Sequence, residues 1–530
     1  MKLCGFSLIY NVRKAASRLL FQYITTMMYK RIATTIALFA LTYAASAQQN
    51  REPHREQFHF SPKAHWMNDP NGMVYYQGTY HLFFQYYPNG TTWGPMHWGH
   101  TTSKDMVHWQ EQPIALYPDS LGLIFSGSVV VDTDNTSGFG RNGQVPLVAI
   151  FTHHNQTLEK AKSNTFQYQS IAYSLDAGKS WTKYAANPVL PNPGIVDFRD
   201  PKVRWFAPTK RWIMTLATKD RITFYSSPNL KNWTKESEFG EKLGAHGGVW
   251  ECPDLFPLTH DGKTVWTLLS SINPGGPNGG SATQYFLGDF DGHTFKPLTT
   301  KTRWMDYGPD NYAGVTFANT GNRTMLMGWM SNWDYANTVP TEGWRSTMTV
   351  PRELGLRMAA NELYLTSVPV KELSSLDGKT TTLTNLKLTD KAQDLTARLG
   401  GKATTYKLTM TAPATADVEL ILSNSAGNEL LIGYDNASNT YYIDRRKSGK
   451  VSFDKSFARR STAPRLSTDR TLSLSLLVDV ASVELVADDG LSVMTGIFFP
   501  EQVMTNLSIR SSSAVIIPTL STTQLKPALP

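Results

Sequence analysis

WMNDPNGMVYYQGTYHLFFQY, residues 66–86, is the stretch that decides the fold. Residues 73–76 and 79–86 are strand-like runs on either side of Gln77-Gly78, a pair suited to a two-residue turn, so they predict a β-hairpin. Ahead of the hairpin, residues 66–72 place one carboxylate, that of Asp69, in what the sequence predicts to be a tight polar turn between aromatic residues.

Short strands and turns continue from about residue 55 to 360, and long periods of 3.6 are missing, so helices should be few. A polar turn followed by a ring recurs along this stretch, at 103–109, 174–181, 227–233 and 289–295. Such turn-plus-aromatic units at intervals of tens of residues favour a β-propeller. The intervals are uneven and leave the number of blades open. Another all-β fold with similar hairpins is the alternative.

The composition changes near residue 360, where tryptophan stops after Trp344 and Thr, Ser, Leu and Val take over. Strand-like runs occupy 405–411, 418–423, 430–434, 441–445, 472–478 and 483–487. They predict a β-sandwich of domain size. We therefore expect a propeller over 55–360, a linker over 361–380 with one short helix around 370–373, and a sandwich over 381–530.

The net charge of the 530-residue chain is +8, but residues 1–47 hold six basic residues and no acid, and without them the charge is +2. No basic stripe remains for nucleic acid, so none is expected as a partner. Residues 1–47 are similar to a signal segment, with basic Lys30-Arg31, an apolar run over 32–43 and the small residues 45–47 as a cleavage site. The run is too short to span a bilayer comfortably, and no cysteine follows the cleavage site. We expect export to a periplasm or the medium, without a membrane anchor.

The two cysteines are Cys4 and Cys252, so removal of residues 1–47 leaves one. This excludes an internal disulfide and a cysteine-rich metal site. Three histidines within 97–108 lie close in sequence, but no carboxylate or cysteine joins them at ligand spacing. The sequence therefore predicts no metal and no cofactor. Cys252 is expected to be a packed small residue, with a nucleophilic thiol as the alternative.

Three acidic clusters carry the chemistry: Asp69 in 66–72, Asp200 in 198–201 and Glu251 in 250–254. Each sets a carboxylate beside proline and near a bulky ring or an arginine, which indicates acid/base work on a sugar. Breaking a glycosidic bond needs two carboxyl groups across the scissile oxygen, one to protonate it and one to attack the anomeric carbon or activate water.

Asp69 is the predicted nucleophile, because Asn68 and Asn71 can hydrogen-bond its carboxylate and keep it ionised. A lone acid before proline is more often a turn residue, and it is the flanking Trp66, Asn68 and Asn71 that favour a catalytic role. Glu251 is the predicted general acid, because Trp250 and Pro253 would surround it with apolar groups and favour its protonated form. The alternative is a glutamate paired with an arginine in the sheet.

Arg199 next to Asp200 is expected to bind sugar hydroxyls while holding the acid charged, although a salt bridge alone would explain the pair.

At these residues the chain resembles family 32 glycoside hydrolases, the β-fructofuranosidases that include invertases, inulinases and levanases. The blocks W-M-N-D-P-N-G, F-R-D-P and W-E-C-P-D occur in family order, and further matches lie at 84–86, 93–94, 97–100 and 125–128. The stretch 328–354 is similar to bacterial levanases and exo-acting inulinases. The resemblance covers about residues 55 to 525.

The resemblance implies an all-β chain with a five-bladed propeller followed by a C-terminal β-sandwich. It implies Asp69 as nucleophile, Glu251 as acid/base and Asp200 as transition-state stabiliser. It implies substrate contacts from a larger set: Trp66, Met67, Asn68, Gln85, Trp93, Phe125, Ser126, Arg199, Trp329 and Trp333. The last two are expected at the rim of the pocket.

The expected activity is release of fructose, with retention, from the ends of levan or inulin, with sucrose as a further candidate substrate. Three alternatives remain: a fructosyltransferase acting on sucrose, an inverting furanosidase of a related propeller family, and a fructan-binding protein without catalysis. The sequence leaves open the β-2,1 or β-2,6 preference, cleavage at ends or within the chain, the role of the sandwich, the oligomeric state and the true start codon.

Overall fold

The computed structural model describes Met27 and residues 52–528. The chain divides into two compact units, Met1–Arg55 and Glu56–Pro530, and the fold described below is that of the second. Apart from Met27, the predicted signal segment lies outside the described residues. Among the described residues, no helix combines the length and the apolar character that crossing a membrane requires.

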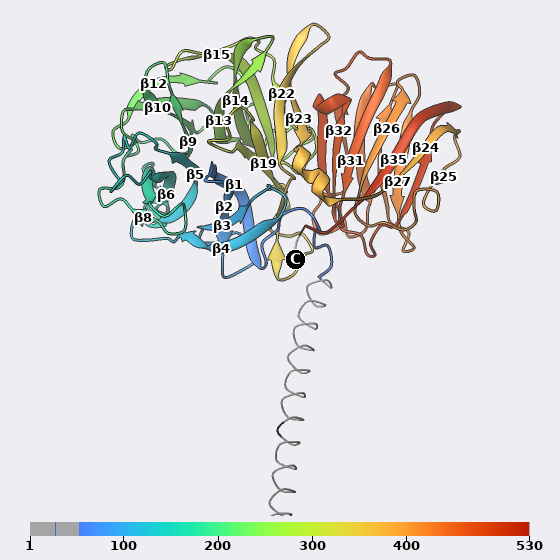
Figure 1. The fold of residues 1–530 in the computed structure, drawn as a ribbon, viewed down its shortest axis with the longest axis horizontal. Helices are drawn as coiled ribbons and strands as arrows, with labels where there is room; N and C mark the ends of the chain where they lie inside the picture. Colours follow the sequence, from blue (N-terminus) through green and yellow to red (C-terminus); the bar gives the residue numbers. More distant parts are fainter. Residues whose placement is uncertain (1–26, 28–51, 529–530) are drawn as a thin grey trace, which may run out of the picture. The chain divides into compact units, whose positions relative to one another are not determined.

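Residues 65–369 form five sheets, coloured from blue to yellow in Figure 1. The innermost strands are β1, β5, β9, β13 and β18, and each contacts the next, with β18 contacting β1 again. This closed circle confirms the propeller and gives it five blades. Backbone hydrogen bonds also close the ring, because β20, from the end of this region, pairs with β1 from its start.

The strands of the first two sheets are β20 (Trp344–Arg345), β1 (His65–Tyr76), β2 (Thr79–Tyr87), β3 (His97–Ser103) and β4 (Trp109–Leu116), then β5 (Leu123–Val131), β6 (Leu147–His154), β7 (Gln167–Ser174) and β8 (Thr182–Lys183). Those of the third and fourth are β9 (Phe198–Phe206), β10 (Arg211–Thr218), β11 (Ile222–Ser227) and β12 (Thr234–Phe239), then β13 (Val249–His260), β14 (Lys263–Asn273), β15 (Ala282–Phe290), β16 (Phe295–Pro297) and β17 (Arg303–Trp304). The fifth contains β18 (Tyr312–Thr316), β19 (Met325–Met330), β21 (Thr347–Met348), β22 (Arg352–Ala359) and β23 (Glu362–Pro369).

The recurring polar turn occupies the same place in four blades, between the third and fourth strands. In the first of these turns the Asp105 carboxylate accepts the backbone N–H of Val107 and His108, both at 2.9 Å. Asp176 and Asn229 accept backbone N–H groups in the same way in the second and third blades. The recurring sequence motif is therefore one turn in each of these four blades. The turn satisfies its own backbone donors before the chain enters the outer strand.

The hairpin predicted from residues 73–86 is present, with Tyr76 opposite Thr79. Gln77 and Gly78 both have positive φ, 47° and 74°, as a type I′ turn requires.

Residues 377–525 form two further sheets, six strands each. One contains β24 (Asp377–Leu388), β35 (Val515–Leu525), β26 (Tyr406–Pro413), β31 (Thr471–Val478), β32 (Ser482–Ala487) and β33 (Ser492–Ile497). The other contains β25 (Gln393–Asp394), β34 (Asn506–Arg510), β27 (Val418–Ser423), β28 (Glu429–Asp435), β29 (Thr440–Lys447) and β30 (Arg460–Pro464). One buried cluster, which includes Leu408, Leu420, Ile432 and Leu476, joins the two sheets as a sandwich core.

Helices are few in the described residues: α2 (Gln156–Lys160) and the 3-10 helices η1 (Lys371–Leu376) and η2 (Asp488–Gly490). η1 lies where a short helix was predicted. The segment predicted as a linker, 361–380, also holds β23, which pairs with β22 and extends the fifth blade. The division into signal segment, propeller, linker and sandwich at the stated boundaries stays a prediction.

Candidate active site

Each of the five innermost strands carries an irregularity at the same level. Three residue steps on the inner strand face two on its neighbour, at 67–70, 124–127, 199–202, 251–254 and 312–315. An extra residue of this kind is a β-bulge, which re-aims side chains and is common beside active sites. The bulges collect residues from five distant parts of the sequence at one end of the propeller axis.

The bulges also correct the prediction of a tight turn at residues 66–72, because this segment is the first half of strand β1. Pro70 and Gly72 are tolerated since the ladder to β2 is interrupted between Met67 and Pro70 and again between Asn71 and Val74. Positive φ at Asp200 (65°), Cys252 (46°) and Ala313 (54°) marks three of the bulges. Non-glycine residues rarely adopt this conformation, so the backbone is strained where the carboxylates are placed.

Asp69 is held by two side-chain donors. Asn68 Nδ2 donates to its Oδ1 at 2.9 Å and Ser126 Oγ donates to its Oδ2 at 3.0 Å. Trp66 Nε1 in turn donates to Asn68 Oδ1 at 2.8 Å, which fixes the amide. Asn71 reaches only the backbone oxygen of Asp69, at 3.5 Å, so the predicted contact of Asn71 with the carboxylate is wrong.

Burial raises the pKa of Asp69, and the nearby charge of Glu251 raises it further, against the lowering effect of Asn68 and Ser126. The prediction that Asn68 and Asn71 keep this acid ionised therefore underestimated how far burial raises its pKa.

Asp200 lines the same cavity as the other two acids. Its Oδ2 accepts the backbone N–H of Cys252 at 3.1 Å, while Arg199 Nε is 4.0 Å from the same oxygen. Burial raises the pKa of Asp200 to about 7; Arg199 opposes the shift, and the charges of Glu251 and Asp69 reinforce it. Burial therefore outweighs Arg199, and the expectation that Arg199 keeps Asp200 charged is wrong. Arg199 is the one cation among the residues that line the cavity, and it forms ion pairs with Glu251, Asp200 and Asp197, which does not line it.

Glu251 is the main partner of that guanidinium. Arg199 Nη2 and Nε donate to Glu251 Oε1 at 2.9 and 3.1 Å, and the Tyr312 hydroxyl donates to Glu251 Oε2. Trp250 points away, into a buried cluster of the third and fourth blades, because successive side chains of a strand face opposite sides. The apolar surroundings predicted for Glu251 are thus replaced by an arginine and a tyrosine, and the arginine pair left open as an alternative is present.

Cys252 is a buried small residue, as predicted, and its thiol lies between two acids. Sγ is 3.5 Å from Asp69 Oδ2 and 3.7 Å from Asp200 Oδ2. Burial raises the pKa of the thiol well above its usual range, and the charges of Asp200 and Asp69 add to the effect. A neutral thiol of this kind is a poor nucleophile.

One cavity of about 320 Å³ contains all three carboxylates. Its lining is Asn68, Asp69, Gln85, Trp93, Phe125, Ser126, Arg199, Asp200, Glu251, Trp333 and Asn337. Ten of these were predicted from the sequence; Asn337 was not. Trp66, Met67 and Trp329, which were also predicted as substrate contacts, are fully buried and do not line the cavity. Trp66 and Trp329 instead pack behind Trp333, with ring centroids 6.0 and 4.9 Å from it, so only one of the two predicted rim tryptophans reaches the cavity.

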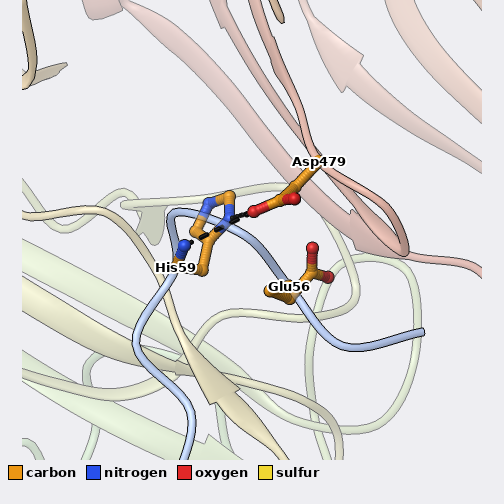
Figure 2. A group of neighbouring side chains, drawn as sticks. All are labelled: Glu56, His59 and Asp479. Carbon is orange, nitrogen blue, oxygen red and sulfur yellow. Dashed lines mark hydrogen bonds and ion pairs between the residues drawn. The ribbon is translucent and has the colours of Figure 1, made fainter. Parts of the chain in front are cut away.

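A second group of titratable residues, which does not line this cavity, has the chemistry of metal ligands. Figure 2 shows His59 directed at Asp479, with Glu56 beside them, and one ligand atom from each lies within 4.8 Å of the others. His59 Nδ1 is 2.9 Å from Asp479 Oδ2 and Nε2 is 3.0 Å from Glu484 Oε1. Burial lowers the pKa of His59, but the two carboxylates outweigh it and raise the pKa to about 10. An imidazolium that donates from both nitrogens has no lone pair for a metal. This group is therefore a cluster of buried ion pairs, which we call the His59 cluster.

Comparison with known proteins agrees with this geometry. The family profile "Glycosyl hydrolases family 32 N-terminal domain" matches residues 59–367, and "Glycosyl hydrolases family 32 C terminal" matches residues 372–525. The chain is 44% identical to a levanase of Bacillus subtilis over 92% of this chain and 73% of the levanase. It is 41% identical to an extracellular exo-inulinase of Aspergillus niger over 89% of this chain and 94% of that protein.

Among solved structures, the exo-inulinase of Aspergillus awamori superimposes with a TM-score of 0.82 at 37% identity, covering 90% of this chain and 99% of that one. The propeller, the sandwich and the cavity of carboxylates are thus those of a glycosidase of the β-fructofuranosidase type, and the chain belongs to glycosyl hydrolase family 32.

Proposed function

We propose that this protein releases fructose from the ends of β-fructans, levan or inulin, and from sucrose, by a double displacement that retains configuration. The observation that carries the proposal is the placement of Asp69, Asp200 and Glu251 around one cavity of about 320 Å³. A cavity of about 320 Å³ has the volume of a small-molecule site, which suits a single terminal sugar.

In this proposal Asp69 attacks C2 of the terminal fructosyl unit while Glu251 protonates the departing oxygen. The C2–O bond breaks, and a covalent fructosyl ester on Asp69 forms. Glu251 then takes a proton from water, the water oxygen attacks C2, and free fructose and the Asp69 carboxylate are regenerated.

The remaining groups around the cavity have supporting roles. The oxocarbenium-like transition state carries positive charge, which the Asp200 carboxylate stabilises from the wall of the same cavity. Arg199 and the Tyr312 hydroxyl fix the plane of the Glu251 carboxyl group by binding its two oxygens separately.

Glu251 must aim one oxygen at the scissile bond in both steps, so these two residues contribute positioning that a flexible glutamate would lack.

The direct test is product analysis. Chromatography of products from inulin, levan and sucrose should show fructose alone; a ladder of oligomers would indicate internal cleavage, and transfer products at high sucrose would indicate a fructosyltransferase. Anomeric NMR of the first product formed should show retained configuration, which separates this mechanism from an inverting one.

Asp69→Asn should abolish fructose release while the fold persists, and full activity of that variant would refute the assignment of the nucleophile.

We also propose that residues 1–47 direct export. The support is the signal-like pattern of these residues and the extracellular location in the name of the Aspergillus relative. Amino-terminal sequencing of the protein recovered outside the cytoplasm should begin near Gln48.

A further inference from the structure

Two residues of the cavity come from one loop, residues 331–343 between β19 and β20, which we call the rim loop. Trp333 and Asn337 line the cavity, while Tyr335 and Val339 are buried on its other side. Asn337 also holds a third lining residue, because its Oδ1 accepts the backbone N–H of Trp93 at 2.9 Å. The position of the rim loop therefore sets a large part of the cavity wall.

The buried side of the rim loop packs on the sandwich. Tyr335 and Val339 form one apolar cluster with Phe457, Ile497 and Phe499, all from the sandwich region of the chain. The Tyr335 and Phe457 rings meet edge to face, with centroids 5.1 Å apart. Because the packing is close, the rim loop cannot shift unless the sandwich side chains that contact it shift as well.

A buried polar group lies at the centre of this cluster. Arg445, on strand β29 of the sandwich, donates from Nη1 to Asp310 Oδ2 at 2.6 Å and from Nη2 to the Tyr335 hydroxyl at 2.8 Å. The Tyr335 hydroxyl donates to the other oxygen, Oδ1, of Asp310. Arg445 also donates from Nε to the backbone oxygen of Phe457 at 2.7 Å. The guanidinium thus ties together the sandwich, the propeller and the rim loop, and burial makes each bond strongly dependent on geometry.

We propose that Arg445 is a positioning residue for the active site: through Tyr335 it sets the rim loop so that Trp333 and Asn337 contact the bound saccharide. The inference rests on the function proposed above. It gives the sandwich a part in substrate recognition, although none of its side chains lines the cavity.

The test is a comparison of two conservative variants. Arg445→Lys keeps the charge beside Asp310 but cannot serve Asp310, Tyr335 and Phe457 together. Tyr335→Phe removes only the hydroxyl and keeps the ring in its apolar cluster. Because the rim loop binds substrate before and during the reaction alike, each variant should raise KM for sucrose and for a fructo-oligosaccharide roughly three- to tenfold with kcat within about twofold. KM does not depend on the fraction of enzyme that folds, so partial misfolding does not imitate this result.

Arg352→Lys is the matched control. Arg352 is equally buried and also joins propeller and sandwich, through bonds to Asp306 at 2.9 Å and Glu484 at 2.6 Å, but among the described residues its hydrogen bonds do not reach the rim loop. It should lower the Tm while leaving KM unchanged. An unchanged KM in Arg445→Lys and Tyr335→Phe, or an equal rise of KM in Arg352→Lys, would overturn the inference.

A double-mutant cycle tests the route of the effect. If Tyr335 acts through Trp333, then Tyr335→Phe should raise KM in the wild-type background and have little effect in Trp333→Ala. Additive effects would contradict that route. Absence of fructose release by the wild-type chain would reject the proposed function alone. In that event Arg445→Lys and Tyr335→Phe should still raise the Kd for a fructo-oligosaccharide, measured by calorimetry, and Arg352→Lys should leave it unchanged. Equal Kd values would reject the inference.

Discussion

Removal of the Tyr312 hydroxyl should disable the acid/base group without touching any carboxylate. Tyr312 is fully buried, and its hydroxyl donates to Glu251 Oε2 while Arg199 holds Oε1. Tyr312→Phe keeps the ring and deletes that one bond, so Glu251 is left free to rotate about its contact with Arg199.

The expected size of the effect follows from the bond that is lost. A hydrogen bond to a charged group contributes about 1.5–3 kcal/mol, which corresponds to about a 10- to 150-fold change in rate if the bond matters only for aiming the carboxyl group. We expect kcat for sucrose to fall within that range, with KM within about threefold, since Tyr312 does not line the cavity. Initial-rate kinetics on purified protein, with the near-UV circular dichroism spectrum as a check of packing, measure both.

Tyr441→Phe is the matched control for this variant. Tyr441 is also fully buried and its hydroxyl donates to the Asp488 carboxylate at 2.8 Å, but both residues belong to the sandwich. It should cost stability and leave kcat unchanged. If Tyr312→Phe retains kcat within twofold of the wild type, the hydroxyl does not orient Glu251 and the reasoning fails.

Three further predictions concern the acids, the Cys252 thiol and the His59 cluster. With p-nitrophenyl β-fructofuranoside, whose leaving group needs no proton, Glu251→Gln should retain the first step and move the acid limb of kcat/KM to lower pH, because the charge of Glu251 no longer raises the pKa of Asp69; an unmoved limb would contradict this coupling. Cys252→Ser should keep kcat within about fivefold, and iodoacetamide at pH 7 should leave the wild type active, since the thiol is buried and neutral; rapid inactivation would revive a reactive cysteine. His59→Gln should destabilise the fold by about 3–5 kcal/mol, because Asp479 loses its cation and Glu484 keeps only Arg352. Since the pKa of His59 is raised from 6.5 to about 10, its contribution is fully present below pH 6.5 and is lost as the pH rises through 10, so the Tm of the wild type should fall over that window and the Tm of His59→Gln should fall less.

The secondary structure of this chain was largely readable from local patterns. The Gln77-Gly78 hairpin, six of the twelve sandwich strands and the short helix η1 lie where the sequence predicts them. Turn chemistry and short apolar runs act over a few residues, so a single sequence contains them. The number of blades did not follow from spacing, because insertions between strands change the intervals while the sheets keep their order.

The three acids were also identifiable, but their surroundings were not. Asp69, Asp200 and Glu251 stand in distinctive local blocks, and the chain's resemblance to a family assigned their roles. Sequence neighbours were poor guides to partners: Trp250 packs away from Glu251, and Arg199 binds Glu251, 52 positions away, more closely than adjacent Asp200.

Tertiary structure alone decided what completes the site. Tyr312 and Asn337 belong to no acidic block, and Arg445 lies in a different domain, so nothing in their local sequence indicated a part in the chemistry. Bulges on four of the inner strands bring Tyr312 and the three acids together, whereas the rim loop supplies Asn337 and a sandwich strand supplies Arg445. The sequence by itself determined which residue types and short elements exist, because those depend on neighbours along the chain. Which charges face one another, and how far burial shifts their protonation, depends on contacts between residues tens to hundreds of positions apart, and only the folded chain fixes those.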